Sequence, residues 1–320
     1  MSTWRLFRPL DTTTLDFLSL GADAAGSLLG GDHFRETGGD LVLDLFGDGL
    51  RASHGELLPF GDITRIELGD SIDAALQVVD IVWDLLKILS YYNPLTDRWD
   101  TQGLLDYLFR EADWFDGSDG NDRFAGLGGN DTLRGGGGID TAIYRGSRGD
   151  FVLTRQADGW QLQDTRGREG RDALNGIERL QFADGDLALD LDGHAGMVAR
   201  LIGALFGKDA LARGDLVGLG LSLLDEGRSW SDLAALAVDS DLFAQAAGSH
   251  SNVDFVRVVY RHVVGTAPDD ATLNHYVQLL DSGATSQATL ALMASQTDLN
   301  AQQIDLAGLT EHGLAFLPAG

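Results

Sequence analysis

Residues 117–143 repeat a nine-residue pattern three times, and this pattern constrains the fold more than any other feature of the chain. The units read GSDGNDRFA, GLGGNDTLR and GGGGIDTAI, each with glycine at its first and fourth positions. Aspartate fills every sixth position, at Asp122, Asp131 and Asp140. Glycine permits tight turns that other residues disfavour. The regular spacing predicts a coil of turns and short strands, although glycine content alone would favour a flexible linker.

In such a coil two units complete one circuit, so stacked turns come from unit n and unit n+2. Stacked strands lie about 4.8 Å apart, which lets an ion lie between two turns and accept an aspartate from each. Calcium accepts six to eight oxygens in irregular geometry, whereas magnesium demands an octahedron. We therefore predict Ca²⁺ as the ion. The eighth-position side chains, Phe124, Leu133 and Ala142, are expected to point inward.

The first and third units predict one complete site, with Asp122 and Asp140 as its carboxylates. The second unit, with Asp131, has poorer partners. One register later the aspartate position is Gly149, and the nearest carboxylate, Asp150, is displaced by one residue.

One register earlier stands Asp113, but Leu108 and Glu111 replace the glycines of that unit. A second, degenerate site is therefore predicted around Asp113 and Asp131. A fourth nonapeptide-like unit, GREGRDALN, follows at 167–175, but its aspartate, Asp172, lies off the nine-residue register.

Composition agrees with a cation-binding protein. The 23 Lys and Arg residues against 49 Asp and Glu residues leave a net charge of −26, which disfavours nucleic acid and anionic membranes as partners. The chain has no cysteine, which excludes disulfides and cysteine-based zinc sites. We predict no cleavable N-terminal signal peptide and no membrane-spanning segment.

The rest of the chain predicts an α+β multidomain protein. Residues 1–110 are expected to form a mixed domain, residues 111–192 the calcium-binding β-roll with a β cap, and residues 193–320 an all-α domain. The predicted N-terminal elements are strands at 41–46 and 63–68, a turn at 47–49, an amphipathic helix at about 71–89 and a short helix at 104–109.

After the repeats we predict a hairpin from strands 151–155 and 160–164, with a glycine turn at 157–159, and then strands 177–182 and 187–191. Helices are predicted at 197–206, 215–224, 231–237, 253–264, 273–280 and 286–295. The motif LLDEG at 223–227 matches LLDSG at 279–283, which predicts an internal duplication of the helical domain.

The three nonapeptides resemble the RTX, or haemolysin-type, calcium-binding repeat, and residues 139–190 resemble the β cap that follows such repeats. The resemblance implies a parallel β-roll in which each ion takes carbonyl oxygens and one aspartate from each of two turns. The implied ligands of the complete site are Ser118, Gly120 and Asp122 with Gly135, Gly137 and Asp140; those of the second site are Gly126, Gly128 and Asp131 with Asp113. Ser118 and Leu127 depart from glycine at position two.

Residues 252–299 resemble a helical domain of unknown function that is often attached to RTX repeats in secreted bacterial proteins. Thr266 and Tyr276 depart from that family's arginine and tryptophan. The resemblance implies type I secretion to an extracellular location, with an uncleaved C-terminal signal. The apolar tail at 316–319 fits such a signal. Low calcium inside the cell would leave the repeats unfolded, and calcium outside would couple binding to folding.

No catalytic motif occurs: none of the seven histidines forms an H-E-x-x-H motif, and there is no G-x-S-x-G elbow or Walker loop. Trp114 and Trp160 are expected to cover the β-roll, with sugar stacking as the alternative. The leading hypothesis is a non-enzymatic secreted calcium-binding protein that binds a cell surface or an extracellular polysaccharide. The alternatives are a secreted hydrolase or polysaccharide-modifying enzyme with its site in residues 1–110, and a self-assembling surface protein.

Overall fold

The computed structural model describes residues 109–319 with their side chains, and Gly103, Asp106 and Tyr107 before them. Of the remaining residues it describes only the backbone of strands between residues 3 and 99. The described residues form sheets and helices, so the α+β class is confirmed. The chain divides into two compact units, residues 1–183 and residues 184–320. The predicted domain boundaries at 110/111 and 192/193 stay predictions.

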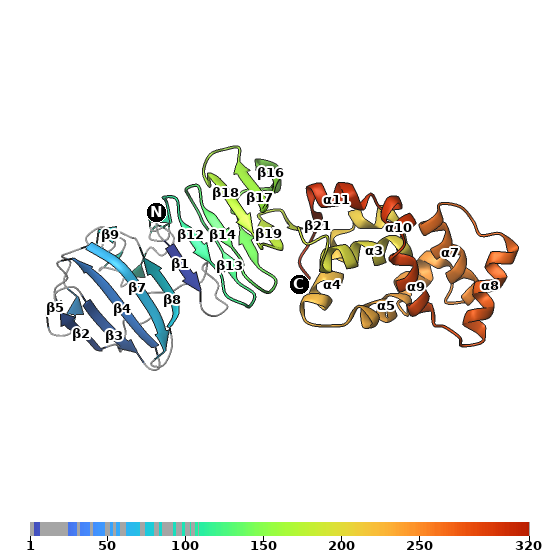
Figure 1. Cartoon of the computed structure of the whole chain (residues 1–320), viewed down its shortest axis with the longest axis horizontal. Coiled ribbons are helices and arrows are strands. Elements are labelled where there is room, and N and C mark those ends of the chain that lie inside the picture. Colours follow the sequence, from blue (N-terminus) through green and yellow to red (C-terminus); the bar gives the residue numbers. More distant parts are fainter. Residues whose placement is uncertain are drawn as a thin grey trace. The chain divides into compact units, whose positions relative to one another are not determined.

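The N-terminal strands form an antiparallel sheet in the order β1-β8-β7-β4-β3-β2, coloured blue in Figure 1. The predicted strands at 41–46 and 63–68 are confirmed, although β4 continues through the predicted turn with a bulge after Phe46. The strand bounds are Thr3–Leu6 (β1), Ala25–Gly30 (β2), His33–Gly38 (β3), Leu41–Asp48 (β4), Ala52–Ser53 (β5), Glu56–Leu57 (β6), Asp62–Asp70 (β7), Ala74–Val79 (β8), Trp83–Asp84 (β9), Tyr92–Asn93 (β10) and Arg98–Trp99 (β11).

The predicted helix at about 71–89 is wrong, because this segment contains strands β8 and β9. β8 lies between β1 and β7, with Leu76 paired to Leu6 on one side and to Leu68 on the other. The helical spacing of acidic residues misled the sequence analysis, while Val78 and Val79 supply the β-branched side chains that suit a central strand. Of the predicted helix at 104–109, Asp106 and Tyr107 are helical.

The repeats build two parallel ladders of short strands. The first ladder joins β12 (Trp114–Asp116), β14 (Thr132–Arg134) and β18 (Arg171–Asn175). The second ladder joins β13 (Arg123–Phe124), β15 (Thr141–Ile143) and β19 (Arg179–Phe182). Successive nonapeptides therefore alternate between the ladders. β12 pairs with β14, and β13 with β15, eighteen residues on, as the period predicts, whereas the hairpin insertion puts β18 and β19 further along the chain. Figure 1 shows these strands side by side.

The inner faces of the two ladders pack on each other. Phe115, Phe124, Leu133, Ala142, Leu174 and Leu180 are each at most 2% exposed. The rings of Phe115 and Phe124, one from each ladder, contact edge to face at 6.0 Å. The inward direction predicted for the eighth-position side chains is therefore confirmed. β1 extends the first ladder by pairing in parallel with β12.

A hairpin is inserted between the third and fourth units. It consists of β16 (Phe151–Gln156) and β17 (Gly159–Asp164), preceded by a short 3-10 turn, η2 (Arg148–Asp150). The predicted hairpin is confirmed. Its second strand pairs antiparallel with β18, so the hairpin extends the edge of the first ladder. Phe151 packs with Tyr144 and Phe182 beneath it, with ring centroids 5.2 Å apart in both pairs.

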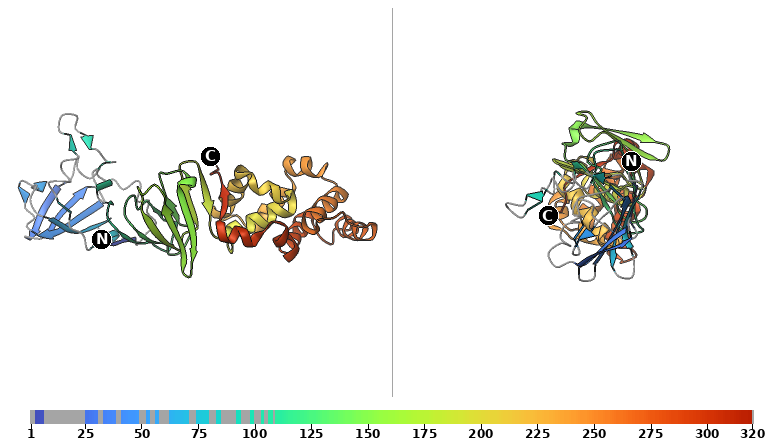
Figure 2. Two further views of the ribbon diagram at one scale, coloured as in Figure 1. Left: turned by 90° about the horizontal axis from the view of Figure 1, so that it is seen from above. Right: turned by 90° about the vertical axis from the view of Figure 1, so that its left-hand side faces the viewer.

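The second unit is helical (Figure 1; yellow to red in Figure 2). All six predicted helices are confirmed, and α6, α10 and α11 were missed by the sequence analysis. The bounds are Gly185–Ala188 (β20), His194–Phe206 (α3), Lys208–Ala212 (η3), Gly214–Asp225 (α4), Trp230–Val238 (α5), Asp241–Ala247 (α6), Asn252–Val264 (α7), Asp270–Asp281 (α8), Gln287–Ser295 (α9), Asp298–Gln303 (α10), Leu306–His312 (α11) and Leu314–Phe316 (β21).

Helix lengths agree with the predicted duplication. α3 and α7 each have 13 residues, α4 and α8 each have 12, and α5 and α9 each have 9. Ser229 and Ser286 cap α5 and α9 in the same way, each accepting from a backbone N–H three residues on. The two halves share one core, in which Phe243 and Phe255 contact at 5.8 Å.

The C-terminal tail is built into the helical unit. β21 pairs antiparallel with β20, and the Leu317 N–H donates to the Gly214 carbonyl at 3.0 Å. The apolar tail at 316–319 is therefore partly ordered by tertiary contacts in the folded protein. Among the described residues, no helix combines the length and the apolar character that a membrane span requires.

Candidate metal centre

The turns of the repeats stack so closely that side chains are excluded between them. A Cβ on Gly135 would lie 1.9 Å from the Gly176 carbonyl oxygen and 2.3 Å from Asp140 Oδ2. Gly126, at the same position of the second unit, would place its Cβ 2.2 Å from Asp131 Oδ2. In the second and third units, first-position glycine is thus required because the carboxylate of its own unit folds back over it, and at Gly117 the Gly135 carbonyl oxygen leaves no room for a Cβ. The glycines were predicted from turn formation alone, and the structure adds this contact.

Each aspartate is tied to the unit stacked on it. In the second ladder the Asp122 N–H donates to Asp140 Oδ1 at 2.7 Å. In the first ladder the Asp113 N–H donates to Asp131 Oδ1 at 2.8 Å. Asp113, Asp122, Asp131 and Asp140 are all at most 2% exposed. The pairings predicted from the spacing, Asp122 with Asp140 and Asp113 with Asp131, are therefore the ones that the turns adopt.

The two pairs of turns have the same backbone geometry. Gly137 N–H donates to the Ser118 carbonyl at 3.0 Å, and Gly128 N–H donates to the Phe109 carbonyl at 2.9 Å. Thr141 N–H reaches the Asp122 carbonyl at 2.9 Å, and Thr132 N–H reaches the Asp113 carbonyl at 2.8 Å. The turn before Asp113 therefore stacks like the others although it lacks glycines, so the site predicted as degenerate has the same backbone frame as the complete one.

The remaining oxygens of two carboxylates have no hydrogen-bond donor among the described residues. These are Asp131 Oδ2 and Asp140 Oδ2, both fully enclosed. A buried acceptor without a donor carries a desolvation penalty of about 1–3 kcal/mol, more for a charged group. A divalent cation would remove that penalty, so the two positions fit Ca²⁺. In the described part of the chain, no three acidic or histidine side chains are placed so that side chains alone could hold a metal ion.

Burial raises the pKa of these carboxyl groups. It raises the pKa of Asp131 to about 9, with the charge of Asp172 as the next cause. Burial also raises the pKa of Asp140 to about 7, and the hydrogen bond from the Asp122 N–H opposes the shift. A cation between the turns would reverse both shifts, because an opposite charge favours the carboxylate.

Other implied ligands lie in the same turns. Ser118 is 8% exposed, and its N–H and hydroxyl both donate to Asp122 Oδ2, at 2.7 and 2.9 Å. Gly120, Gly126, Gly128, Gly135 and Gly137 occupy the stacked turns next to the aspartates. At position two, Leu127 adopts a left-handed φ of 63°, a strained value for this residue, whereas Ser118 does not.

Asp172 belongs to the first ladder, which corrects its placement outside the register. Asp131 N–H donates to Asp172 Oδ1 at 2.9 Å, and Thr132 pairs with Ala173. The hairpin insertion accounts for the extra residues, so the later partner of Asp131 is Asp172 and neither Gly149 nor Asp150. The sequence identified GREGRDALN as a nonapeptide-like unit, but its pairing with the second unit was not predicted. The second ladder ends on Glu178, whose Oε2 accepts from the Asp140 N–H at 2.9 Å.

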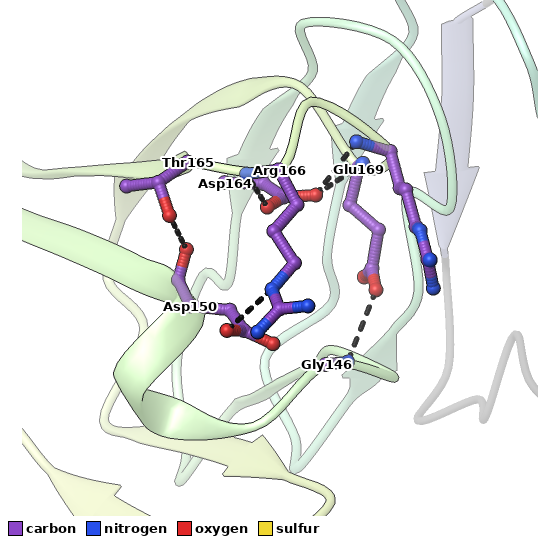
Figure 3. Close-up of polar contacts among 7 residues, drawn as sticks. Gly146, Asp150, Asp164, Thr165, Arg166 and Glu169 are labelled. Carbon is purple, nitrogen blue, oxygen red and sulfur yellow. Dashed lines mark hydrogen bonds and ion pairs between the residues drawn. The ribbon is translucent and has the colours of Figure 1, made fainter.

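The loop before β18 is fixed by two buried carboxylates. Asp164 accepts from the backbone N–H groups of Arg166, Arg168 and Glu169, at 2.7 to 2.9 Å (Figure 3). Glu169 reaches back to the segment after β15 and accepts from Gly146 N–H at 3.2 Å. These bonds hold the start of the fourth unit against the end of the third, which brings Asp172 into the ladder.

A polar cavity of about 570 Å³ lies beside this loop. Four arginines and four acidic residues line it. Two ion pairs form among these residues: Arg166 with Asp150 at 2.6 Å and Arg145 with Asp106 at 2.7 Å. Arg168 also lines the cavity, and no described residue forms an ion pair with its side chain.

The two tryptophans of the repeat region are covered by arginines. The Arg155 guanidinium lies 4.6 Å from the ring centroid of Trp160, which is 5% exposed. Arg134 lies 4.3 Å over Trp114, whose indole N–H donates to Asp116. Covering the sheet is therefore the role that these contacts favour, as the sequence predicted.

Comparison with known proteins agrees with this geometry. Residues 110–142 match the RTX calcium-binding nonapeptide repeat, in four copies, and residues 234–303 match DUF4214, a domain of unknown function. The predicted resemblance is confirmed, and Ca²⁺ is the ion that these repeats bind. The match begins before residue 113 and so includes the unit of Asp113.

No curated protein matches the chain significantly. Among solved structures, the extracellular lipase LipA from Serratia marcescens is similar to part of the chain. The match has 19% identity and a TM-score of 0.15, and it covers 24% of this chain and 15% of that one. Because the chain spans so little of that enzyme, the lipase activity is not carried over to it.

Proposed function

We propose that this chain is a secreted, non-enzymatic calcium-binding protein in which Ca²⁺ folds the repeats into a parallel β-roll. The observation that carries the proposal is the pair of enclosed oxygens, Asp131 Oδ2 and Asp140 Oδ2, which have no donor in the described part of the chain. Each ion would take two carboxylates, and the carbonyl oxygens of the stacked turns would complete its coordination.

We infer two sites that share one backbone frame. One lies between the turns of Asp122 and Asp140, with carbonyls of Ser118, Gly120, Gly135 and Gly137. The other lies between the turns of Asp113 and Asp131, with carbonyls of Gly126 and Gly128. The matching backbone hydrogen bonds of the two pairs of turns support one calcium ion in each pair.

Export before folding accounts for the charge and for the ordered tail. Without calcium the buried carboxylates oppose folding of the repeats, and millimolar calcium outside the cell removes this opposition. The residues proposed as a secretion signal pack against α4 through Leu317 once the helical unit has folded. The type I machinery would therefore read them while the chain is still unfolded.

Outside the cell we propose that the protein binds a surface or an extracellular polysaccharide. The polar cavity beside β18 supports this role, because its ion pairs offer both donors and acceptors to the hydroxyl groups of a sugar. Pelleting of the protein with insoluble polysaccharide in calcium, and its release by chelator, would support the binding role. Turnover of a polysaccharide or ester substrate by the pure protein would contradict a non-enzymatic role.

Thermal unfolding tests the calcium sites. Wild type, Asp131→Asn, Asp140→Asn and the control Asp119→Asn are compared in chelator and in millimolar calcium. Asp119 lies in the same turn as Asp122, but its side chain is exposed. We expect a large calcium-dependent rise in Tm for wild type and control, and a rise about half as large for each site variant. Equal rises in all four proteins would contradict the assignment.

A further inference from the structure

Asp172 occupies the third position of the first ladder, but its carboxylate is satisfied differently from those before it. Asp131, Asp140 and Asp172 each accept from the stacked unit through Oδ1, at 2.8, 2.7 and 2.9 Å. Their Oδ2 atoms are therefore equivalent. Among the described residues, the Oδ2 atoms of Asp131 and Asp140 have no donor, whereas Asp172 Oδ2 accepts from the Tyr144 hydroxyl at 2.9 Å.

Tyr144 is held rigidly where it makes this contact. It directly follows β15, and its N–H donates to the Gln181 carbonyl at 2.9 Å. The side chain is 5% exposed, and its ring lies 5.2 Å from that of Phe151 and 5.8 Å from that of Phe182. The hydroxyl is therefore aimed at Asp172 by packing from both the insertion and the second ladder.

At its first position, the turn of the fourth unit is also more open than the turns of the second and third units. Gly167 holds the first position, and a Cβ there would meet nothing within 4 Å. At the same position, Gly126 and Gly135 lie directly under their aspartates. The first residue of the fourth unit thus does not lie under Asp172, although Gly170, at the fourth position, still stacks closely on Gly129.

We propose that the Tyr144 hydroxyl takes the place of a calcium ion at Asp172 and thereby ends the array of calcium sites. This inference rests on the proposed function, because it assigns ions to the positions of Asp131 and Asp140. The hydroxyl donates one hydrogen bond to the oxygen that a cation would otherwise bind, so the buried carboxylate is compensated without metal. Tyr144 thus limits the number of ions that the repeats hold.

Counting calcium ions on the full-length protein tests the proposal. Native mass spectrometry in millimolar calcium is applied to wild type, Tyr144→Phe, Asp172→Asn and the double variant. We expect two ions for wild type and two for Asp172→Asn. Tyr144→Phe, which frees Asp172 Oδ2, should gain one ion, held more weakly because the turn is open. The double variant should return to two.

A second measurement, of Tm with and without calcium, keeps the test valid if the Tyr144→Phe variant is less stable than wild type. The calcium-dependent rise in Tm should be larger for Tyr144→Phe than for wild type, while the control Tyr260→Phe, in the helical unit, should match wild type. Two ions on Tyr144→Phe together with an unchanged rise in Tm would overturn the inference. Absence of calcium from wild type would instead overturn the proposed function.

Discussion

At the scale of single residues, the sites depend on carboxylates that are buried in the folded repeats. Burial raises the pKa of Asp140 and of Asp172 to about 7, and that of Asp131 to about 9, from an ordinary 3.8. The calcium-free folded state therefore keeps protons that the unfolded chain releases. Calcium and protons compete for the same oxygens, which makes the affinity for calcium dependent on pH.

The first prediction concerns this pH dependence. A carboxyl group whose pKa is raised by folding stabilises the folded state while it is protonated, and that contribution is lost as the pH rises through the raised value. In chelator, Tm of the repeats should therefore fall between pH 6 and pH 9. In calcium, Tm should fall less, so the difference between Tm in calcium and Tm in chelator should widen as the pH rises. If scanning calorimetry gave the same dependence of Tm on pH in calcium and in chelator, this prediction would be contradicted.

The second prediction separates two glycines of one turn. Gly135→Ala would place a Cβ against the Gly176 carbonyl and Asp140 Oδ2, whereas the nearest atom to a Cβ at Gly137 is 3.4 Å away. We expect Gly135→Ala to lose about 1–3 kcal/mol of unfolding free energy and most of the calcium response of its site. Gly137→Ala should change stability by less than about 1 kcal/mol. Urea unfolding in calcium measures both, and equal effects would argue against close stacking.

At the scale of elements, the fourth unit reaches its ladder only because the loop before it is anchored. Asp164 is 7% exposed and accepts from three N–H groups of that loop. Burial alone would raise its pKa, but the N–H groups of Glu169, Arg166 and Arg168 outweigh burial and lower it. The carboxylate therefore stabilises the folded loop at neutral pH, and this contribution is lost as the pH falls through its lowered pKa.

The third prediction tests this anchor. Asp164→Ala leaves three buried or partly buried donors without an acceptor, and we expect a loss of about 2–4 kcal/mol in unfolding free energy. The control, Asp158→Ala, removes an exposed carboxylate from the turn of the same hairpin and should be nearly neutral. Chemical denaturation provides both values. A neutral effect of Asp164→Ala would show that the loop is held by other contacts.

The sequence predicted best those elements that depend on local pattern. The repeats, their inward side chains and six helices follow from spacing within about twenty residues. The segment at 74–79 became a strand because β1 and β7, distant in sequence, pair on both of its sides. Asp172 was misplaced because the length of the hairpin insertion hides its register. The bond from Tyr144 to Asp172 depends on tertiary packing and leaves no signal in the spacing.

At the scale of the whole molecule, the chain combines a unit that contains calcium-binding repeats with a helical unit built on its own apolar core. The helical unit buries Phe243, Phe255 and Leu205 completely. Helices α5 to α11 are capped by serine, threonine and aspartate side chains, as at Ser251 and Asp269, and these caps need no metal. Folding of the two units should therefore respond differently to calcium.

The fourth prediction follows from this difference. Differential scanning calorimetry in chelator should show a transition of the helical unit that calcium leaves nearly unchanged, and circular dichroism at 222 nm should report the same midpoint. Calcium should add or raise a separate transition that belongs to the repeats. A single transition that shifts as a whole with calcium would contradict independent folding of the two units.

Hydrogen exchange, followed peptide by peptide on the intact protein, tests the central claim most directly. The amide N–H groups of Asp122, Thr132 and Thr141 donate to acceptors in the stacked turn, so their protection reports whether the turns are stacked. We predict fast exchange of peptides from residues 110–142 in chelator and slow exchange in millimolar calcium, with helical peptides unchanged. Equal protection of the repeats under both conditions would show that calcium does not fold them.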